Sequence, residues 1–308
     1  MDFKLTIVIP TKDRRNILQE SLVHLANATY HVSVEILVIN DGGELSDLGI
    51  DDLQIIPNEG LGVASARNTG VRNSQSGLIL FMDDDIWLTK EAIDHILIFH
   101  KERPNSALNI NWIYPESLAD ALESTSFGRY LQCHGFTSLK GWNRSSVWYE
   151  QSLFETHGIT SQNLSMRKTT FNKVGGYNQQ FPFAGFEDHE FSARLRSNNI
   201  KIFIDSSVMT YHNECDRQEI GNWLERKYRS GITRKVGVEM GFSELEIHYS
   251  WYKKMILILI LVFAPILKLM AVNCLTNRNK ALDFISFRII GVLLAASIYR
   301  GYSTSYKK

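Results

Sequence analysis

The feature that most constrains the fold is a regular alternation of short β-branched runs and helical stretches through the first 82 residues. Strands are predicted at Leu5–Pro10, Val34–Asn40, Leu53–Ile56 and Leu78–Met82, with helices at Asn16–Ala28 and Val63–Ser74 between them. Alternating strands and helices favour a parallel sheet whose faces are covered by the helices. We therefore expect an α/β fold with a mostly parallel sheet flanked by helices.

The charge of the chain is balanced overall but unevenly distributed. The 308 residues carry 33 basic and 33 acidic side chains. From Ser250 onward there are nine basic residues and one acid, Asp283, so this segment is basic and the preceding 249 residues are acidic. An acidic body disfavours nucleic acid as a partner, because polynucleotide binding needs a basic surface. A basic tail suits an anionic membrane surface.

The cysteines and the amino-terminal segment indicate a reducing compartment. Cys133, Cys215 and Cys274 are widely spaced and contain no C-x-x-C pair, which argues against a disulfide framework or a zinc site. The first 15 residues place charges around a run of only five apolar residues, which is unlike a signal peptide. We expect the chain to act in the cytoplasm.

The second half of the body is harder to divide into elements. Residues 118–162 are polar, aromatic and weakly periodic, and no element is predicted there with a defined boundary. A helix is expected at Glu187–Arg196, followed by strands at Lys201–Ile204 and Val208–His212. Trp142, Trp148 and Tyr149 could stack on a sugar or pack a core, and packing is the favoured interpretation.

The tail contains two apolar runs, Met255–Leu267 and Ile289–Tyr299. Both are shorter than the roughly 20 residues of a spanning helix, although Met255–Val272 is borderline if Lys268 snorkels. We expect a pair of in-plane or re-entrant helices, and the alternative is a tail packed on the body or on a second subunit. The basic residues expected at the lipid headgroups are Lys253, Lys254, Arg278, Lys280, Lys307 and Lys308.

Three consecutive acids, Asp83, Asp84 and Asp85, follow the strand Leu78–Met82. Like charges this close repel unless a cation neutralises them, and carboxylates are ligands for Mg²⁺ or Mn²⁺. The alternative is a solvated acidic loop that caps the next helix. A parallel sheet binds ligands at the carboxyl ends of its strands, which is where this triplet lies.

Two further signals are weak when each is taken alone. Glu187 and Asp188 form a second pair of acids, but acids are also ordinary at the start of a helix. His212 closes a strand, and a lone histidine is more often a hydrogen-bonded structural group than a metal ligand.

The order of these motifs is more informative than any one of them. The series VIPTKDR, VINDGG, NEGLGVASARNTG, LILFMDDD, VGGYNQQF, GFEDHEFSARLR and TYHNE resembles the family-2 inverting glycosyltransferases of the GT-A fold, and the match runs from Leu5 to about Arg234. The resemblance implies a GT-A domain over residues 1–249, with a nucleotide-sugar-binding half at 1–100 and an acceptor-binding half at 101–249. Residues 250–308 would form a membrane-associating helical tail.

The resemblance also implies roles for individual residues. Asp83 and Asp85 match the D-x-D signature that binds ribose and the metal ion, and Asp188 of the E-D pair formed with Glu187 matches the base that deprotonates the acceptor. His212 matches a further metal ligand found in some relatives. The residues implied in binding the nucleotide sugar are Pro10, Thr11, Arg15, Asp41, Arg67, Asn68, Asp83 and Asp84.

The expected enzyme therefore uses Mn²⁺ or Mg²⁺ and a nucleotide sugar, with a uridine diphosphate sugar as the default donor. The metal offsets charge on the leaving diphosphate while Asp188 takes the acceptor proton, and one displacement inverts the anomeric carbon. The acceptor is expected to be a saccharide or a lipid-linked saccharide, met at the cytoplasmic face of the membrane during synthesis of a cell-surface polysaccharide or glycolipid.

Three alternatives remain open at this point. A polyprenyl-phosphate sugar synthase would share the fold and the metal but would need no general base. A membrane-bound scaffold that binds nucleotides or glycans would have lost catalysis. A nucleotidyltransferase would also pair carboxylates with a metal ion, and it would release pyrophosphate.

Overall fold

The chain, described here from a computed structural model, divides into two compact units. The described residues are 4–45, 48–50, 53–143, 147–272 and 279–306. The first unit comprises Met1–Ile113, Ser138–Gln179 and Glu187–Asn213, and the second comprises Tyr114–Thr137, Gln180–Phe186 and Glu214–Lys308. The boundaries of these units differ from the expected boundaries at residues 100 and 249. The expected division into a nucleotide-sugar-binding half, an acceptor-binding half and a tail stays a prediction.

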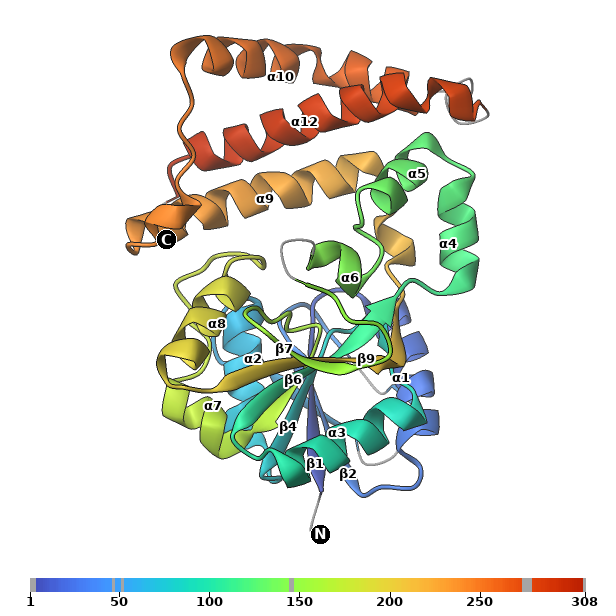
Figure 1. Cartoon of the computed structure of the whole chain (residues 1–308), viewed down its shortest axis with the longest axis vertical. Coiled ribbons are helices and arrows are strands. Elements are labelled where there is room, and N and C mark those ends of the chain that lie inside the picture. Colours follow the sequence, from blue (N-terminus) through green and yellow to red (C-terminus); the bar gives the residue numbers. More distant parts are fainter. Residues whose placement is uncertain (1–3, 46–47, 51–52, 144–146, 273–278, 307–308) are drawn as a thin grey trace. The chain divides into compact units, whose positions relative to one another are not determined.

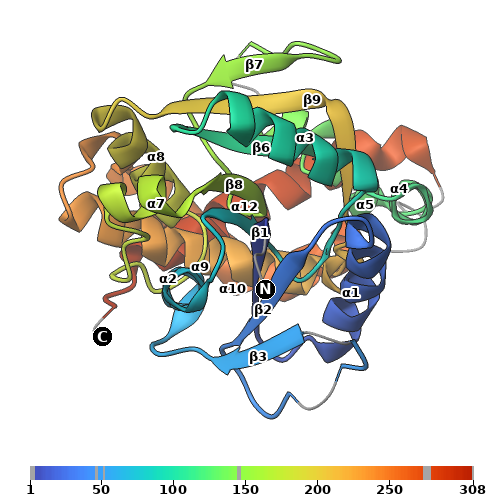
Figure 2. The ribbon, with the colours of Figure 1, turned by 90° about the horizontal axis from the view of Figure 1, so that it is seen from below.

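Within the described residues, nine strands of the first unit form one mixed sheet. Figure 2 shows the ribbon of this sheet from below. The strand order is β3-β2-β1-β4-β8-β6-β9-β5, and β7 also pairs with β9. Strand β1 is parallel to β2 and β4, and β6 is parallel to β9, so the expected mostly parallel α/β sheet is confirmed. The strands are β1 Leu5–Thr11, β2 Val34–Asn40, β3 Leu53–Pro57, β4 Leu78–Met82, β5 Ile86–Trp87, β6 Ser106–Ile113, β7 Leu153–Thr156, β8 Asn163–Arg167 and β9 Lys201–His212.

Helices of the first unit cover both faces of this sheet and bury two apolar cores. Helices α1 (Arg15–Thr29) and α3 (Lys90–Glu102) pack on one face. On the other face lie α2 (Gly62–Asn73), α7 (Lys168–Val174) and α8 (Glu187–Ser197), and a short helix, α6, spans Leu139–Trp142. Alternate residues of β1 enter opposite cores, which explains why its sequence is an unbroken apolar run.

The prediction of two strands near the end of this unit is wrong. Lys201–His212 is one strand, β9, whose pairing with β6 shifts in register. Ile110 pairs with Asp205, but the next residue, Asn111, pairs with Met209. The intervening residues of β9 bulge from the ladder, which interrupts the apolar alternation and makes one strand read as two.

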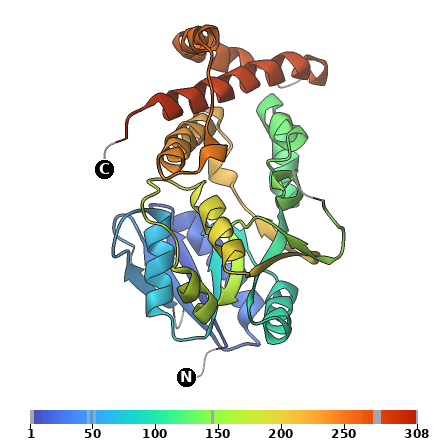
Figure 3. The ribbon, with the colours of Figure 1, turned by 60° about the vertical axis from the view of Figure 1, so that its left-hand side comes forward.

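The second unit is helical. Its helices are α4 Glu116–Glu123, α5 Ser126–Cys133, α9 Ile220–Glu239, α10 Trp251–Ala271 and α12 Asp283–Ser303, with short 3₁₀ turns at Cys215–Arg217, Ser243–Leu245 and Lys280–Leu282. Helix α12 lies between α9 and α10 (Figures 1 and 3, where α10 is orange and α12 is red). The two expected helices of the tail are thus present.

These tail helices are longer than the apolar runs predicted from the sequence. Each has 21 residues, because α10 includes flanking aromatic and basic residues and α12 continues through Arg288 and Arg300. By length and composition alone, both could cross a membrane, a test that buried helices of soluble proteins also pass. Four residues named in the sequence analysis lie outside the described residues: Cys274, Arg278, Lys307 and Lys308.

Candidate active site

The site begins where β1 and β4 end beside each other. Thr11, the last residue of β1, donates its hydroxyl to Oδ2 of Asp84 at 2.7 Å. The guanidinium of Arg14 donates to Asp84 and, at 2.9 Å, to Oδ2 of Asp85. Asp84 and Asp85 are buried, so the alternative of a solvated acidic loop is wrong for these two residues.

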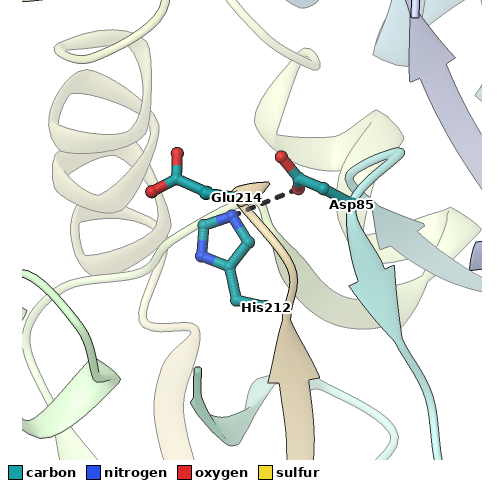
Figure 4. A group of neighbouring side chains, drawn as sticks. All are labelled: Asp85, His212 and Glu214. Carbon is teal, nitrogen blue, oxygen red and sulfur yellow. Dashed lines mark ion pairs between the residues drawn. The ribbon is translucent and has the colours of Figure 1, made fainter. Parts of the chain in front are cut away.

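The short strand β5 brings Asp85, the third acid of the triplet, close to His212. Ile86, the first residue of β5, pairs with His212 at the end of β9, and the N–H of Asn213 donates to the backbone oxygen of Asp85. Oδ1 of Asp85 lies 3.1 Å from Nε2 of His212, and the two residues are 1% and 2% exposed. Figure 4 shows this pair joined by a dashed line.

This pair fits a divalent cation. Neighbouring ligands of an octahedral ion bonded at about 2.1 Å lie about 3 Å apart, close to the distance between the Asp85 oxygen and the His212 nitrogen. Glu214, the third side chain drawn in Figure 4, begins the next segment of the second unit two residues after His212. Its proximity in the sequence makes it a further candidate ligand, one that sequence reasoning missed.

Arg67 of α2 connects the acidic triplet to the E-D pair. Its Nη2 lies 3.1 Å from Oδ1 of Asp83, and its Nη1 lies 3.2 Å from Oε1 of Glu187. Burial opposes the charge on Arg67, but Asp83 and the other acids around it hold its pKa above the usual value. One guanidinium therefore brings together acids that are more than a hundred positions apart in the sequence.

Asp188, the predicted base, is held by Ser161. The backbone N–H of Ser161 donates to Oδ2 of Asp188 at 3.0 Å, and its hydroxyl donates to Oδ1. The hydroxyl of Tyr177 is hydrogen-bonded to that of Ser161. Burial raises the pKa of Asp188, while Arg67 and Ser161 act in the opposite direction. Asp188 therefore takes up a proton more readily than an exposed aspartate.

Two residues predicted to bind the nucleotide have partners within the protein. Oδ1 of Asp41 accepts from Asn58 and from the backbone N–H of Gly62, which opens α2. The side-chain amide of Asn68 exchanges two hydrogen bonds of 2.8 Å with the backbone of Tyr177. Both side chains therefore shape the loops around the site, and contact between them and a nucleotide stays a prediction.

At the start of α1, the structure places Arg14, rather than the predicted Arg15, against the acids. Arg14 precedes the first helical residue and turns toward Asp84, whereas Arg15 is exposed on α1. Pro10 is buried in β1 beside β2. Sequence reasoning also missed Ser161, since an isolated serine in an unassigned segment carries no recognisable signal.

The aromatic residues of the middle segment pack mainly on one another. Trp148 and Tyr149 both lie with ring centroids 5.4 Å from that of Phe154 in β7. Trp142 remains exposed at the end of α6. Trp148 is partly buried, in agreement with the favoured packing interpretation, whereas Tyr149 is 54% exposed and does not pack into a core.

The mixed sheet flanked by helices, with acids clustered at the ends of its strands, defines an α/β fold of the GT-A type. Comparison with protein families gives the particular family. Residues 6–171 match glycosyl transferase family 2, and residues 152–214 match the description "N-terminal domain of galactosyltransferase". The chain belongs to glycosyl transferase family 2.

Similar curated proteins are much longer than this chain. It is 31% identical over 102 residues to glycosyltransferase GlyA of Streptococcus pneumoniae, covering 30% of this chain and 14% of that protein. It is 24% identical over 264 residues to chondroitin synthase of Pasteurella multocida, covering 75% of this chain and 27% of the synthase. The chain thus spans well under half the length of these two relatives.

Two solved structures share the fold. A mannosyltransferase, PcManGT from Pyrobaculum calidifontis, solved with GDP-Man and Mn²⁺, has a TM-score of 0.58 at 13% identity, covering 99% of this chain and 89% of its own. GalNAc-T7, solved with UDP, GalNAc and Mn²⁺, has a TM-score of 0.52 at 11% identity, covering 77% and 51% respectively. At these identities the likeness shows the fold.

Proposed function

We propose that this enzyme transfers a sugar, with inversion, from a nucleotide diphosphate sugar to a hydroxyl group of a saccharide or lipid-linked acceptor. The observation that carries the proposal is the position of Arg67 between Asp83 and Glu187. This guanidinium joins the acids expected at the donor to the helix that bears the expected base. The product would be a cell-surface polysaccharide or glycolipid.

Asp85 and His212 are the proposed metal ligands in the first unit, and Glu214 is a further candidate. A nitrogen ligand beside a carboxylate favours Mn²⁺ over the harder Mg²⁺. The bound ion would supply positive charge against the leaving diphosphate. Thr11 and Arg14 orient the acids Asp84 and Asp85 by hydrogen bonds, so the carboxylates need little rearrangement when the donor binds.

Asp188 is the proposed general base. Each of its carboxylate oxygens already accepts one hydrogen bond from Ser161, and an ionised carboxylate can accept about four in all. The remaining capacity allows Asp188 to accept the proton of the acceptor hydroxyl as its oxygen bonds to the anomeric carbon. The bond from that carbon to the phosphate oxygen breaks, and the nucleoside diphosphate leaves with the electron pair.

The base separates this proposal from a polyprenyl-phosphate sugar synthase. A hydroxyl acceptor has to lose its proton, whereas a phosphate acceptor is already ionised. Asp188→Asn should reduce turnover by about 100-fold or more while the affinity for nucleotide diphosphate with Mn²⁺ is unchanged. Thermal-shift titration measures the binding, and release of the nucleoside diphosphate measures the turnover. Nearly full activity in this variant would favour the synthase.

Attachment to an anionic membrane at its cytoplasmic face is part of the proposal. The second unit contains two apolar helices of 21 residues together with the whole of the basic tail. An enzyme held at this surface would meet acceptors linked to lipids. Loss of sedimentation with membranes after removal of residues 250–308 is the expected result.

A further inference from the structure

The residues of α10 divide into an inner and an outer face of different character. Seven residues repeat at helical spacing and are buried or half-buried: Leu257, Ile260, Leu261, Ala264, Leu267, Lys268 and Ala271. The outer face holds nine large apolar side chains exposed by 46% to 70%: Met255, Ile256, Ile258, Leu259, Val262, Phe263, Ile266, Leu269 and Met270. Soluble helices normally expose their polar side, so a face of this kind needs a covering partner.

The charges of α10 are kept away from that outer face. With 100° per residue, the nine outer side chains cover roughly 160° of the helix surface. Lys253 and Lys254 project outside this arc, and Lys268 lies on the inner face. A helix lying flat on a bilayer has this distribution, with apolar side chains among the acyl chains and lysines level with the phosphates.

Helix α12 is fixed to protein at both ends. Near its start, Asp283 accepts two hydrogen bonds from Arg129 of α5, at 2.8 and 2.6 Å. Near its end, Gly301 crosses Gly231 of α9 so closely that a Cβ added at Gly301 would lie 1.9 Å from the backbone oxygen of Tyr228. An α12 that left this packing to span a bilayer would lose both attachments.

Helix α9 cannot accompany α12 into a membrane. It carries seven charged residues among its 20, and each charge at the centre of a bilayer is costly. Since α12 packs on α9 and α10 packs on the other side of α12, the three helices form a layered group in which α10 exposes nine large apolar side chains and α12 exposes three, Phe284, Ile285 and Val292. Length and composition allow two spans, but a span by α12 would break its packing on α9.

A cavity of about 320 Å³ lies within the same three helices. Its lining includes Lys268 from α10, Arg300 and Ser297 from α12, and Tyr228 and Glu225 from α9. Arg300 lies over the Tyr228 ring, 4.8 Å from its centroid. The cavity thus combines two basic side chains with two hydroxyl groups and a single acid.

We propose that α10 lies in the plane of an anionic bilayer with its outer face among the acyl chains, while α12 stays packed on α9 and does not cross. This inference rests on the proposed membrane attachment and specifies its geometry. It assigns α10 to a lipid surface rather than to a second copy of the chain, because the exposed Lys253 and Lys254 at the start of α10 lie outside an uncharged apolar face and complement anionic headgroups.

Binding to vesicles tests the face. In the full chain, Val262→Glu with Ile266→Glu should reduce affinity for phosphatidylglycerol-containing vesicles by at least about 100-fold, because both side chains are more than half exposed on the outer face. Ile285→Glu with Val292→Glu is the matched control on α12, at side chains that are 41% and 40% exposed, and should change affinity less than about threefold. Equal losses in the two variants would overturn the proposal. The proposal would also be overturned if the parent chain forms a dimer without lipid and the α10 variant does not, because the outer face would then bind a second copy.

Cysteine labelling tests whether α12 crosses. With the three native cysteines replaced by serine, Ala281→Cys and Ser305→Cys mark the two ends of α12. In inside-out membrane vesicles, an impermeant maleimide should label both positions; protection of Ala281→Cys until detergent is added would mean that the helix spans. If no variant or parent chain binds membranes at all, the attachment itself fails. Turnover of a soluble acceptor reports separately on the transferase proposal.

Discussion

Arg67 is the residue that holds the two acidic groups of the site together. Its side chain is buried, so without acids around it the charge would be costly to retain. Asp83 and Glu187 accept hydrogen bonds from different nitrogens of its planar guanidinium. The Cζ atom of the guanidinium lies 5.2 Å from the centroid of the Tyr177 ring. A lysine could not reproduce this fork, since its single ammonium group has no fixed planar geometry.

Ser161→Ala should shift the pH dependence of turnover. A general base works only when ionised, so activity is present above the pKa of Asp188 and is lost as pH falls through it. The Ser161 hydrogen bonds lower that pKa, which burial raises. Removing the hydroxyl donor should move the acid limb of kcat/KM upward by about one unit.

Ser192→Ala is the control for this shift. The Ser192 hydroxyl donates to the backbone oxygen of Asp188, at 2.6 Å, and not to its carboxylate. The acid limb of this variant should match that of the parent enzyme. If Ser161→Ala leaves the limb in place as well, a group other than Asp188 controls it.

Single residues also mark where sequence reasoning reached its limit. The family resemblance implies an arginine near the first strand at the donor site, and it assigns this role to Arg15. Helix α1 begins at Arg15, so Arg14 precedes it and faces the sheet edge. Helix boundaries are uncertain by one or two residues in sequence prediction, and adjacent residues of a helix start point in different directions.

At the level of whole elements, the most regular segments could be predicted from sequence. β2 and β4 have the expected bounds, β1 is one residue longer at its end, and α1 and α2 differ from the expected bounds by one residue at each end. The middle segment could not be divided, because α4 and α5 have only eight residues each and α5 buries consecutive positions from Ser126 to Leu131. Short helices of this kind have too few turns to show a periodic apolar face.

The connection between α3 and the sheet should weaken in acid because of His100. Its Nε2 lies 2.9 Å from the Ser165 hydroxyl of β8, and burial lowers its pKa to about 3. The unfolded chain, with an ordinary histidine pKa near 6.5, therefore binds the proton first. The contribution of neutral His100 to the free energy of unfolding is present above about pH 6.5. It is lost as pH falls below that value, by about 1.4 kcal/mol at pH 5.5.

Urea unfolding of His100→Gln measures this contribution. Glutamine can still hydrogen-bond Ser165 but does not titrate. Between pH 7.5 and 5.5, the free energy of unfolding of the variant should therefore fall by about 1.4 kcal/mol less than that of the parent chain. The other histidines are common to both proteins and cancel in the comparison. Identical falls would show that His100 is protonated in the folded state.

The contact between α9 and α12 should tolerate no side chain at Gly301. Gly301→Ala places a Cβ against the backbone oxygen of Tyr228 and should cost roughly 1–3 kcal/mol of stability, since two helix backbones have to separate. Gly291→Ala, on the same helix, meets no atom within 4 Å and should be neutral or stabilising by up to about 1 kcal/mol. Chemical denaturation of both variants checks the difference, and a stable Gly301→Ala would contradict the close crossing.

At the level of the whole molecule, the charge is divided in a way that suits a surface enzyme. Residues from 250 onward carry nine basic side chains and one acid, whereas the earlier residues are acidic overall. Anionic lipid repels an acidic body and attracts a basic tail. The electric field of the protein therefore favours an orientation in which the tail meets the membrane first. The sequence alone predicted this polarity; which helix meets the lipid required the packing of α12 on α9.

Reversing two charges should separate electrostatic attraction from apolar insertion. Lys253 and Lys254 are exposed at the start of α10, and a basic residue near an anionic surface contributes about 1 kcal/mol. Lys253→Glu with Lys254→Glu should therefore weaken binding to phosphatidylglycerol-containing vesicles by at least about 30-fold at low salt. The difference from the parent chain should shrink at high salt, where the Debye length falls to about 3 Å.

Neutral phosphatidylcholine vesicles provide the control for this variant. They offer the acyl chains without the net charge, so both proteins should bind them weakly and equally through the outer face of α10. Sedimentation with the two kinds of vesicle measures the two contributions separately. If the charge-reversed chain loses its affinity for neutral vesicles too, the lysines support the fold of α10 and do not act by attracting anionic lipid.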